Sequence, residues 1–271
     1  MNKMIIKICL LFLITCLSLF LVILAKDIIN WKIDSNNIKK EIRDIYKNIE
    51  VNEIKDKDST IIVNQDSNTP KSNPYWDYIK MNLIDVNFKN LKKINSDTKG
   101  WIQVNGTNIN YPFVQANNND FYLNHTLNKS ENQAGWVFLD YRNDINNLSK
   151  NTILYAHGRL DQTMFGSLKN ILKNDWLNNK SNYIVKLSTE KENSLWQVFS
   201  VYIIPNTNDY IKVSFNSNSE FNEWTNILKN RSDFNFNTTI NELDKVLTLS
   251  TCYNENEKVV LHAKLIKLEQ K

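Results

Sequence analysis

Two adjacent β-type runs near the C-terminus constrain the fold of this chain more than any other stretch. The first is Val246-Leu247-Thr248-Leu249-Ser250-Thr251-Cys252, which is filled with β-branched and apolar residues. The second, residues 258–266, has the sequence KVVLHAKLI. Only the polar run 253–257 separates them, and strands joined by so short a loop form an antiparallel hairpin. The sequence therefore predicts that these two runs pair side by side.

This hairpin places a thiol next to a cation. Cys252 ends the first run and Lys258 opens the second, so the two are predicted to face each other. Facing residues of an antiparallel pair have Cβ atoms about 4.5–5.5 Å apart. A cation at that distance favours the thiolate, which is the form that attacks carbonyl groups. The alternative interpretation is that Cys252 is a small buried hydrophobic residue.

The N-terminus carries an apolar run over residues 8–25. A membrane span needs about 20 apolar residues, whereas the apolar core of a cleaved signal peptide has about 7–15. We therefore predict an uncleaved signal-anchor over residues 1–25, with cleavage near Ala25 as the alternative. Lysines flank the run on both sides, so the distribution of positive charge does not decide which end of the span faces the cytoplasm. Because a long polar domain after a single anchor is usually exported, we expect a single-pass protein of the cell membrane with residues 26 onward outside the cell.

Cysteine usage supports a reactive role for Cys252. Cys9 and Cys16 lie inside the apolar run, which leaves Cys252 as the one cysteine of the predicted exported part. An unpaired thiol in an oxidising compartment is either reactive or paired with another molecule.

Between the anchor and the hairpin, the patterns predict a mainly β domain. Isoleucines at helical spacing predict a juxtamembrane helix that packs on the domain, and a polar linker follows over 55–73, so residues 26–73 form a helix and stalk. Residues 75–94 predict one or two helices at the start of a domain spanning 74–271. Short strands are predicted at 101–104, 109–114, 135–139, 152–156, 183–187, 196–204 and 210–215. Ser217-x-x-Glu220 predicts the start of a late helix. Together these predict a closed β-barrel with helical insertions.

Three histidines are candidates for the general acid or base that a thiol nucleophile needs. His157 ends the strand 152–156 and precedes Gly158, so it is well placed to reach a thiol at another strand end. His125 lies in a polar stretch with turn character, and His262 lies inside the last strand, where a structural role is simplest. His157 is the preferred candidate, with the other two left open.

Several classes of function are excluded by missing motifs. No His or Cys spacing matches a metal site, no glycine-rich phosphate loop is present, and no G-x-S-x-G motif marks a serine hydrolase. We therefore predict no metal and no cofactor. The net charge of +4 is scattered and forms no basic stripe interleaved with aromatic residues, so nucleic acid is not an expected partner.

The sequence resembles the class B sortases, which are cysteine transpeptidases of Gram-positive cell surfaces. The resemblance covers about residues 74–268. It is carried by Leu247-Thr248-Leu249-Ser250-Thr251-Cys252, which is similar to the family's TLxTC signature, and by the segments 99–102, 109–115, 138–143, 151–158 and 163–168. It implies a closed barrel of about eight strands, with N-terminal helices and a helix inserted in a late loop near 219–230.

The resemblance also implies a reaction. Cys252 would attack the threonine carbonyl of an NPxT-type sorting signal and form a thioester, as in cysteine endopeptidases of EC class 3.4.22. His157 would protonate the leaving amine, and the surface protein would pass to an amine of a peptidoglycan precursor or cross-bridge. The backbone N–H of Tyr253 is a predicted oxyanion donor. Family analogy predicts that four residues line the substrate groove: Leu123, Tyr210, Ile211 and Ser250.

The chain departs from the family pattern at one position. Where the family has an arginine at the start of the last strand, this chain has Lys258, which keeps the charge but loses the bidentate guanidinium. Three explanations are open: Lys258 replaces the arginine, another arginine such as Arg159 or Arg231 does so, or the enzyme is slow. The departure also motivates a weakly active or inactive domain that binds surface proteins or cell-wall peptides. A thiol hydrolase and a pure adhesin are further alternatives.

Overall fold

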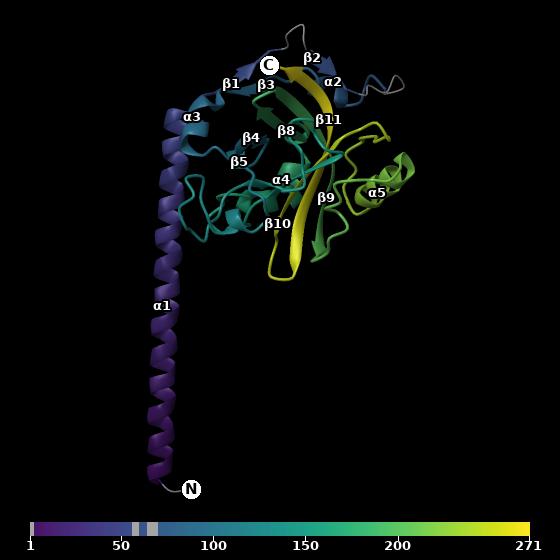
Figure 1. Ribbon diagram of the computed structural model, residues 1–271. Helices are drawn as coiled ribbons and strands as arrows, with labels where there is room; N and C mark the ends of the chain where they lie inside the picture. Colours follow the sequence, from purple (N-terminus) through teal and green to yellow (C-terminus); the bar gives the residue numbers. More distant parts are fainter. Residues whose placement is uncertain (1–2, 56–59, 64–69) are drawn as a thin grey trace.

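In the computed structural model, a β-barrel is attached to one very long helix (Figure 1). The structure describes residues 3–55, 60–63 and 70–271. Helix α1 (Lys3–Asn48) runs along one side of the barrel and extends far beyond it, and helix α5 (Asn218–Asn230) lies on the other side. The prediction of a mainly β domain with N-terminal helices and a helix in a late loop is confirmed.

Eight of the strands in the described part of the chain close a mixed barrel. Around the ring they are β10 (Val246–Cys252), β7 (Asn151–Tyr155), β6 (Phe138–Leu139), β5 (Asn110–Val114), β4 (Thr98–Val104), β8 (Ile184–Thr189), β9 (Glu192–Pro205) and β11 (Glu257–Gln270). The antiparallel pairing of β10 with β11 closes the ring. The predicted C-terminal hairpin is therefore confirmed, and it is the element that makes the sheet a barrel.

Strands β10 and β11 are buried on both faces. Along β11, Val259, Leu261 and Ala263 pack into the main core, whereas Val260 packs into a second cluster against α5. The alternation follows from the two-residue period of a strand. Ser217 caps α5 by accepting a hydrogen bond from the backbone N–H of Glu220 at 3.1 Å, which confirms the predicted helix start.

Helix α1 combines the predicted anchor and juxtamembrane helix in one continuous element. Its most apolar window of 18 residues has a mean hydropathy of 3.1 and is not buried at all, so α1 is long and apolar enough to cross a membrane. Four isoleucines at helical spacing are buried against the domain: Ile38, Ile42, Ile45 and Ile49. The prediction that this part of the helix packs on the domain is confirmed.

Two predictions for residues 55–94 need correction. Strand β2 (Thr60–Ile62) lies within the predicted linker and pairs antiparallel with residues 267–269 near the C-terminal end of β11. Residues 56–59 and 64–69 of the same linker lie outside the described residues. The predicted helices over 75–94 are α2 (Tyr75–Tyr78) and α3 (Phe88–Ile94), but between them lies strand β3 (Leu83–Val86), which pairs with β1 (Val51–Ile54).

The remaining helices are single turns or short 3-10 segments in the loops. They are η1 (Phe121–Leu123), η2 (Gly166–Leu172), α4 (Asn174–Leu177) and η3 (Lys180–Asn182). Segment η1 lies in the loop that follows β5, and η2 lies in the loop that follows β7. Leu123 of the first loop and His157 of the second come together near Cys252.

Candidate active site

The thiol of Cys252 lies at the end of β10 and contacts a lysine. Cys252 and Lys258 are register partners in the β10–β11 hairpin, as predicted. The Lys258 Nζ donates a hydrogen bond to the Cys252 Sγ at 3.0 Å. Because the loop between them is tight, the hairpin itself fixes the cation beside the sulfur.

Strand β7 delivers His157 to the same edge of the sheet. Strands β10 and β7 are parallel, and Ser250 pairs with Tyr155. Two residues beyond that pair the chain reaches Cys252 on one strand and His157 on the other. Neighbouring strands lie about 4.8 Å apart. Of the three candidate histidines, His157 is therefore the one that the topology places beside the thiol.

Gly158 is needed for this close approach. A Cβ at this position would lie 2.1 Å from the carbonyl oxygen of Cys252, which is shorter than any real contact. The neighbouring Thr251 donates from Oγ1 to the carbonyl oxygen of Ala156 at 2.7 Å, which ties the two strand ends together. A side chain at position 158 would push the histidine strand away from the cysteine strand.

The imidazole of His157 is oriented by the loop that contains η1. Its Nε2 lies 2.7 Å from the carbonyl oxygen of Leu123. A carbonyl oxygen can only accept, so Nε2 carries the proton in this contact and Nδ1 is the nitrogen left for proton transfer. Leu123, a predicted groove residue, thus also orients the histidine through its backbone.

The other two histidines are held elsewhere. His125 stacks on Phe121 with ring centroids 4.0 Å apart. His262 is fully buried, with Tyr202 Oη 2.7 Å from its Nε2 and Thr248 Oγ1 2.9 Å from its Nδ1. Burial, together with the charge of Arg231, lowers the pKa of His262 to about 3. The structural role predicted for His262 is confirmed.

A cavity of about 690 Å³ opens over the thiol and the imidazole. Fifteen residues line it: Asn119, Leu123, Phe138, Tyr155, Ala156, His157, Asn206, Thr207, Asn208, Tyr210, Ile211, Ser250, Thr251, Cys252 and Lys258. All four residues predicted for the groove are among them. Within this described lining, Lys258 is the one lysine or arginine.

The two arginines considered as alternatives to Lys258 are engaged away from this cavity. The guanidinium of Arg159 donates from Nε to Asp161 Oδ1 at 3.2 Å and to Thr163 Oγ1 at 3.0 Å. Arg231 forms a bidentate pair with Asp209. Neither arginine lines the cavity, so in this structure Lys258 occupies the position next to the thiol.

The prediction that the backbone N–H of Tyr253 is an oxyanion donor does not fit this geometry. That N–H already donates to the carbonyl oxygen of Glu257 at 2.8 Å, inside the hairpin loop. Because the Tyr253 N–H is used in this hydrogen bond within the loop, it is not free to donate to a substrate oxyanion. Lys258 is the donor that does face the Cys252 sulfur.

Tyr210 and Ile211 form one wall of the cavity, and their segment, residues 210–215, is not the predicted strand. No ladder pairs with this segment among the described residues. Its carbonyl groups are satisfied by a side chain, because Asn151 Nδ2 donates to the carbonyl oxygens of Tyr210 at 3.4 Å and Lys212 at 2.9 Å. The hydroxyl of Tyr210 lies 2.9 Å from Ser250 Oγ, and burial raises the pKa of this tyrosine.

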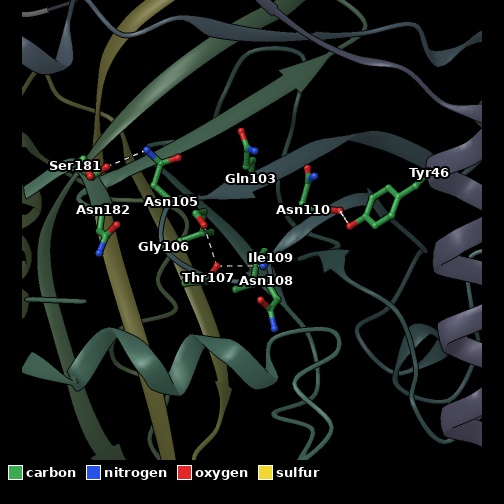
Figure 2. A pocket seen from close by; sticks show the side chains of 11 residues that line it. Tyr46, Gln103, Asn105, Gly106, Thr107, Asn108, Ile109, Asn110, Ser181 and Asn182 are labelled. Carbon is green, nitrogen blue, oxygen red and sulfur yellow. Dashed lines mark hydrogen bonds between the residues drawn. The ribbon is translucent and has the colours of Figure 1, made fainter. Parts of the chain in front are cut away.

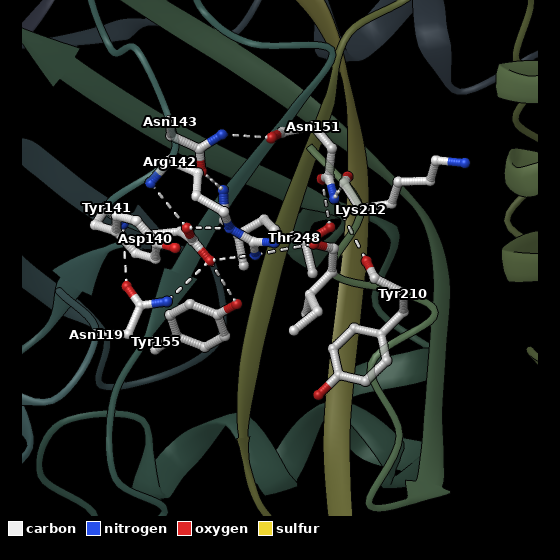
Figure 3. A network of polar contacts seen from close by, with 12 residues as sticks. Asn119, Asp140, Tyr141, Arg142, Asn143, Asn151, Tyr155, Tyr210, Lys212 and Thr248 are labelled. Atoms are coloured by element: carbon white, nitrogen blue, oxygen red, sulfur yellow. Dashed lines mark hydrogen bonds and ion pairs between the residues drawn. The ribbon is translucent and has the colours of Figure 1, made fainter. Parts of the chain in front are cut away.

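A polar network behind this wall is a feature that the sequence interpretation missed (Figure 3). The fully buried Asp140 accepts two bonds from Arg142, from Nε at 2.8 Å and from Nη2 at 2.7 Å. It also accepts from Tyr155 Oη at 3.0 Å and from Asn119 Nδ2 at 3.1 Å. Arg142 in turn donates to the carbonyl oxygen of Ile211 at 3.1 Å. Three cavity-lining residues are thus fixed by one carboxylate and its arginine.

We expect Asp140→Asn to destabilise the protein by about 2–4 kcal/mol at neutral pH, because it leaves a partly buried guanidinium unpaired. Burial alone raises the pKa of Asp140, but the bonds from Arg142 and Tyr155 outweigh it and lower the pKa. A lowered pKa stabilises the fold above the usual carboxyl range and loses that effect as pH falls through the folded-state value. The gap between wild type and variant should therefore shrink below about pH 4.

Urea denaturation at several pH values measures this gap. The exposed Asp175, changed to asparagine, is the matched control and should stay near wild type. An Asp140→Asn variant as stable as that control at pH 7 would contradict the role of the network.

A second groove, of about 540 Å³, lies between α1 and the β4–β5 hairpin (Figure 2). Its described lining is mostly asparagine, glutamine and threonine, together with Tyr46, whose hydroxyl donates to the carbonyl oxygen of Asn110 at 2.5 Å. This lining includes no cysteine, histidine, lysine, arginine or carboxylate. Cys252 and His157, the predicted nucleophile and acid–base group, both line the first cavity, which is therefore the candidate active site.

Comparison with known proteins gives one consistent family. A family model described as the sortase domain matches residues 102–266. Sortase B of Staphylococcus aureus is 35% identical over 185 residues, which are 67% of this chain and 75% of that protein. Among solved structures, sortase B of B. anthracis in complex with AAEK1 has a TM-score of 0.67 at 32% identity, covering 87% of this chain and 99% of that one. The Staphylococcus aureus sortase B–substrate complex has a TM-score of 0.62 at 35% identity, covering 66% and 84%.

Proposed function

The chain belongs to the sortase family as a class B sortase, a group of cysteine transpeptidases that anchor surface proteins, and we propose that it cleaves an NPxT-type sorting signal through a thioester on Cys252. The observation that carries this proposal is the Cys252 thiol with the Lys258 ammonium 3.0 Å away, in a cavity that His157 also lines. The acceptor in the proposal is an amine of a peptidoglycan precursor or cross-bridge.

In the first half-reaction, the Cys252 thiol passes its proton to His157 Nδ1, and Sγ forms a bond to the threonine carbonyl carbon as the carbonyl π electrons move to the oxygen. As the tetrahedral intermediate collapses, the C–N bond breaks and His157 gives a proton to the departing amine. The product is a thioester between Cys252 and the new C-terminal threonine. Lys258 first stabilises the thiolate and then faces the developing oxyanion, because the attack moves negative charge from the sulfur to the carbonyl oxygen.

In the second half-reaction, the acceptor amine attacks the thioester. His157 now takes the proton that this amine loses. The C–S bond breaks, the Cys252 sulfur leaves as a thiolate, and the proton on His157 restores the starting thiol–imidazole pair. The proposed groove residues Leu123, Tyr210, Ile211 and Ser250 hold the peptide during both steps. The hydrogen bond between Tyr210 and Ser250 supports a groove that is formed before the peptide binds. A preformed groove reduces the conformational entropy that is lost on binding.

We also propose that the barrel lies on the extracellular face, held by α1 as a single membrane span. The apolar and exposed first half of α1 supports the anchor, and the docked second half supports a barrel held close to the bilayer. At 1.5 Å per residue, Trp31 is only about 9 Å beyond Ala25, the predicted end of the anchor. Substrates tethered to the same membrane would then meet the cavity without a long reach.

Transfer, rather than hydrolysis, is tested by adding an amine. The full chain in detergent is incubated with an NPxT peptide, with and without a glycine-based amine nucleophile, and the products are separated by mass. A ligated product that grows with amine concentration supports transpeptidation. Free threonine-terminated peptide as the only product at every amine concentration would instead identify a thiol hydrolase.

The role of Lys258 gives a separate prediction. Lys258→Ala should lower kcat/KM by about 10²–10³-fold, because it removes the cation that faces both thiolate and oxyanion. Lys258→Arg keeps the charge and should stay within about tenfold of wild type. The exposed Lys173, changed to alanine, is the matched control. Turnover of Lys258→Ala equal to that of the control would show that the lysine has no part in the chemistry.

A further inference from the structure

The loop that follows His157 is compact and strained. In this loop (residues 157–165, the histidine loop), the backbone N–H of Phe165 donates to the carbonyl oxygen of His157 at 3.1 Å, so the loop closes on the histidine itself. Gln162 and Met164 have φ angles of 64° and 52°, in the left-handed region that side chains disfavour by about 1–2 kcal/mol each. Such a conformation persists only where surrounding contacts over-determine it.

Asp161 organises the histidine loop from within. Its carboxylate accepts from Arg159 Nη2 at 3.1 Å, from the backbone N–H of Thr163 at 3.1 Å and from Thr163 Oγ1 at 2.6 Å. The side chains of Arg159 and Asp161 are only 6% and 5% exposed. A buried charge pair of this kind is stable only when its remaining hydrogen-bonding capacity is satisfied.

Helix α1 supplies the missing partners. Ser35 Oγ donates to Asp161 Oδ2, and Lys39 Nζ lies 3.9 Å from the same oxygen. One turn earlier, the ring of Trp31 lies 5.8 Å from the guanidinium carbon of Arg159. Residues 31, 35 and 39 share one face of the helix, since four residues make about one turn. This face covers the outer side of the histidine loop, while Gly158 packs against Cys252 on the inner side.

We propose that the membrane-anchor helix is a positioning element of the active site: the face formed by Trp31, Ser35 and Lys39 holds the histidine loop, and thereby His157, beside Cys252. This inference rests on the proposed role of His157 as the acid–base group. As a consequence, weakening the contacts between α1 and the histidine loop should slow the reaction, although the variant keeps every residue that takes part in the chemistry.

The test uses the full chain in detergent with Ser35→Ala, which removes one donor to Asp161, and with Trp31→Ala as a second variant. We expect kcat on an NPxT peptide to fall about tenfold, because a small displacement of His157 lowers the rate of proton transfer. KM should stay within about twofold of wild type. Backbone amides of residues 157–165 should exchange with deuterium several-fold faster, while the rest of the barrel is unchanged. Ile33→Ala, on the opposite and 51% exposed face of α1, is the matched control.

An unchanged kcat in both Ser35→Ala and Trp31→Ala would overturn the proposal. So would a fall in kcat that Ile33→Ala shows equally, or one accompanied by faster exchange throughout the barrel, since both indicate general destabilisation. If the wild-type chain neither cleaves nor acylates, the proposed function fails instead, and deuterium exchange in the histidine loop alone then decides whether the helix holds it.

Discussion

Replacing Cys252 by alanine should reduce cleavage of a sorting-signal peptide by at least about 10⁴-fold, because removal of a nucleophile leaves only binding and electrostatic stabilisation. The variant should fold normally. Cys252 is only partly buried, and the side-chain hydrogen bond that it loses is the one from Lys258.

Initial rates of peptide cleavage by the full chain measure this loss. The chain offers its own matched controls, because Cys9 and Cys16 lie in the apolar part of α1. Replacing either of them by serine should leave the rate unchanged. Turnover by Cys252→Ala within a hundredfold of wild type would place the chemistry on another residue.

The second large effect is expected for His157→Gln, which should lower kcat by about 10²–10⁴-fold. Glutamine can still donate a hydrogen bond to the carbonyl oxygen of Leu123, so the local geometry is largely kept. It cannot carry a proton to the leaving amine or take one from the acceptor, and both half-reactions should slow.

Single-turnover kinetics separate the two half-reactions in this variant. His125→Gln is the matched control, since His125 stacks on Phe121 and does not line the cavity. Equal turnover in the two glutamine variants would contradict the assignment of His157 as acid and base.

The closure of the barrel and the contact between Cys252 and Lys258 could be predicted from the sequence, because both depend on short-range patterns. The β10–β11 hairpin follows from two β-type runs and a short polar loop, and its register alone brings Lys258 to Cys252. His157 was identified as the end of a strand, and the parallel pairing of that strand with β10 explains why this position is the relevant one.

The sequence interpretation failed where distant side chains replace regular pairing. Residues 210–215 look like a strand, but their carbonyl groups are satisfied by Asn151 from another part of the chain. The polar segment 55–73 looks like a linker, yet strand β2 within it pairs with the C-terminal end of β11. Tyr253 looks like an oxyanion donor, but its N–H is used inside the hairpin loop.

The supporting network of the site also could not be predicted. Asp140 fixes Tyr155 and Asn119 directly and Ile211 through Arg142, and these residues come from four separate stretches of the chain. The segment that contains Asp140 and Arg142 contributes to the family resemblance, which was the one signal that pointed to it. Its physical role depends on contacts that appear only in the folded chain.

Intact-mass spectrometry detects the thioester that we propose between Cys252 and the threonine of a sorting signal. The full chain is incubated with an NPxT peptide, without an added amine, and its mass is compared with that of Cys252→Ala treated in the same way. We expect a mass increase equal to the acyl part of the peptide, on the wild type alone and reversible with hydroxylamine. No adduct and no cleavage across a varied set of peptides, or an equal adduct on Cys252→Ala, would contradict it.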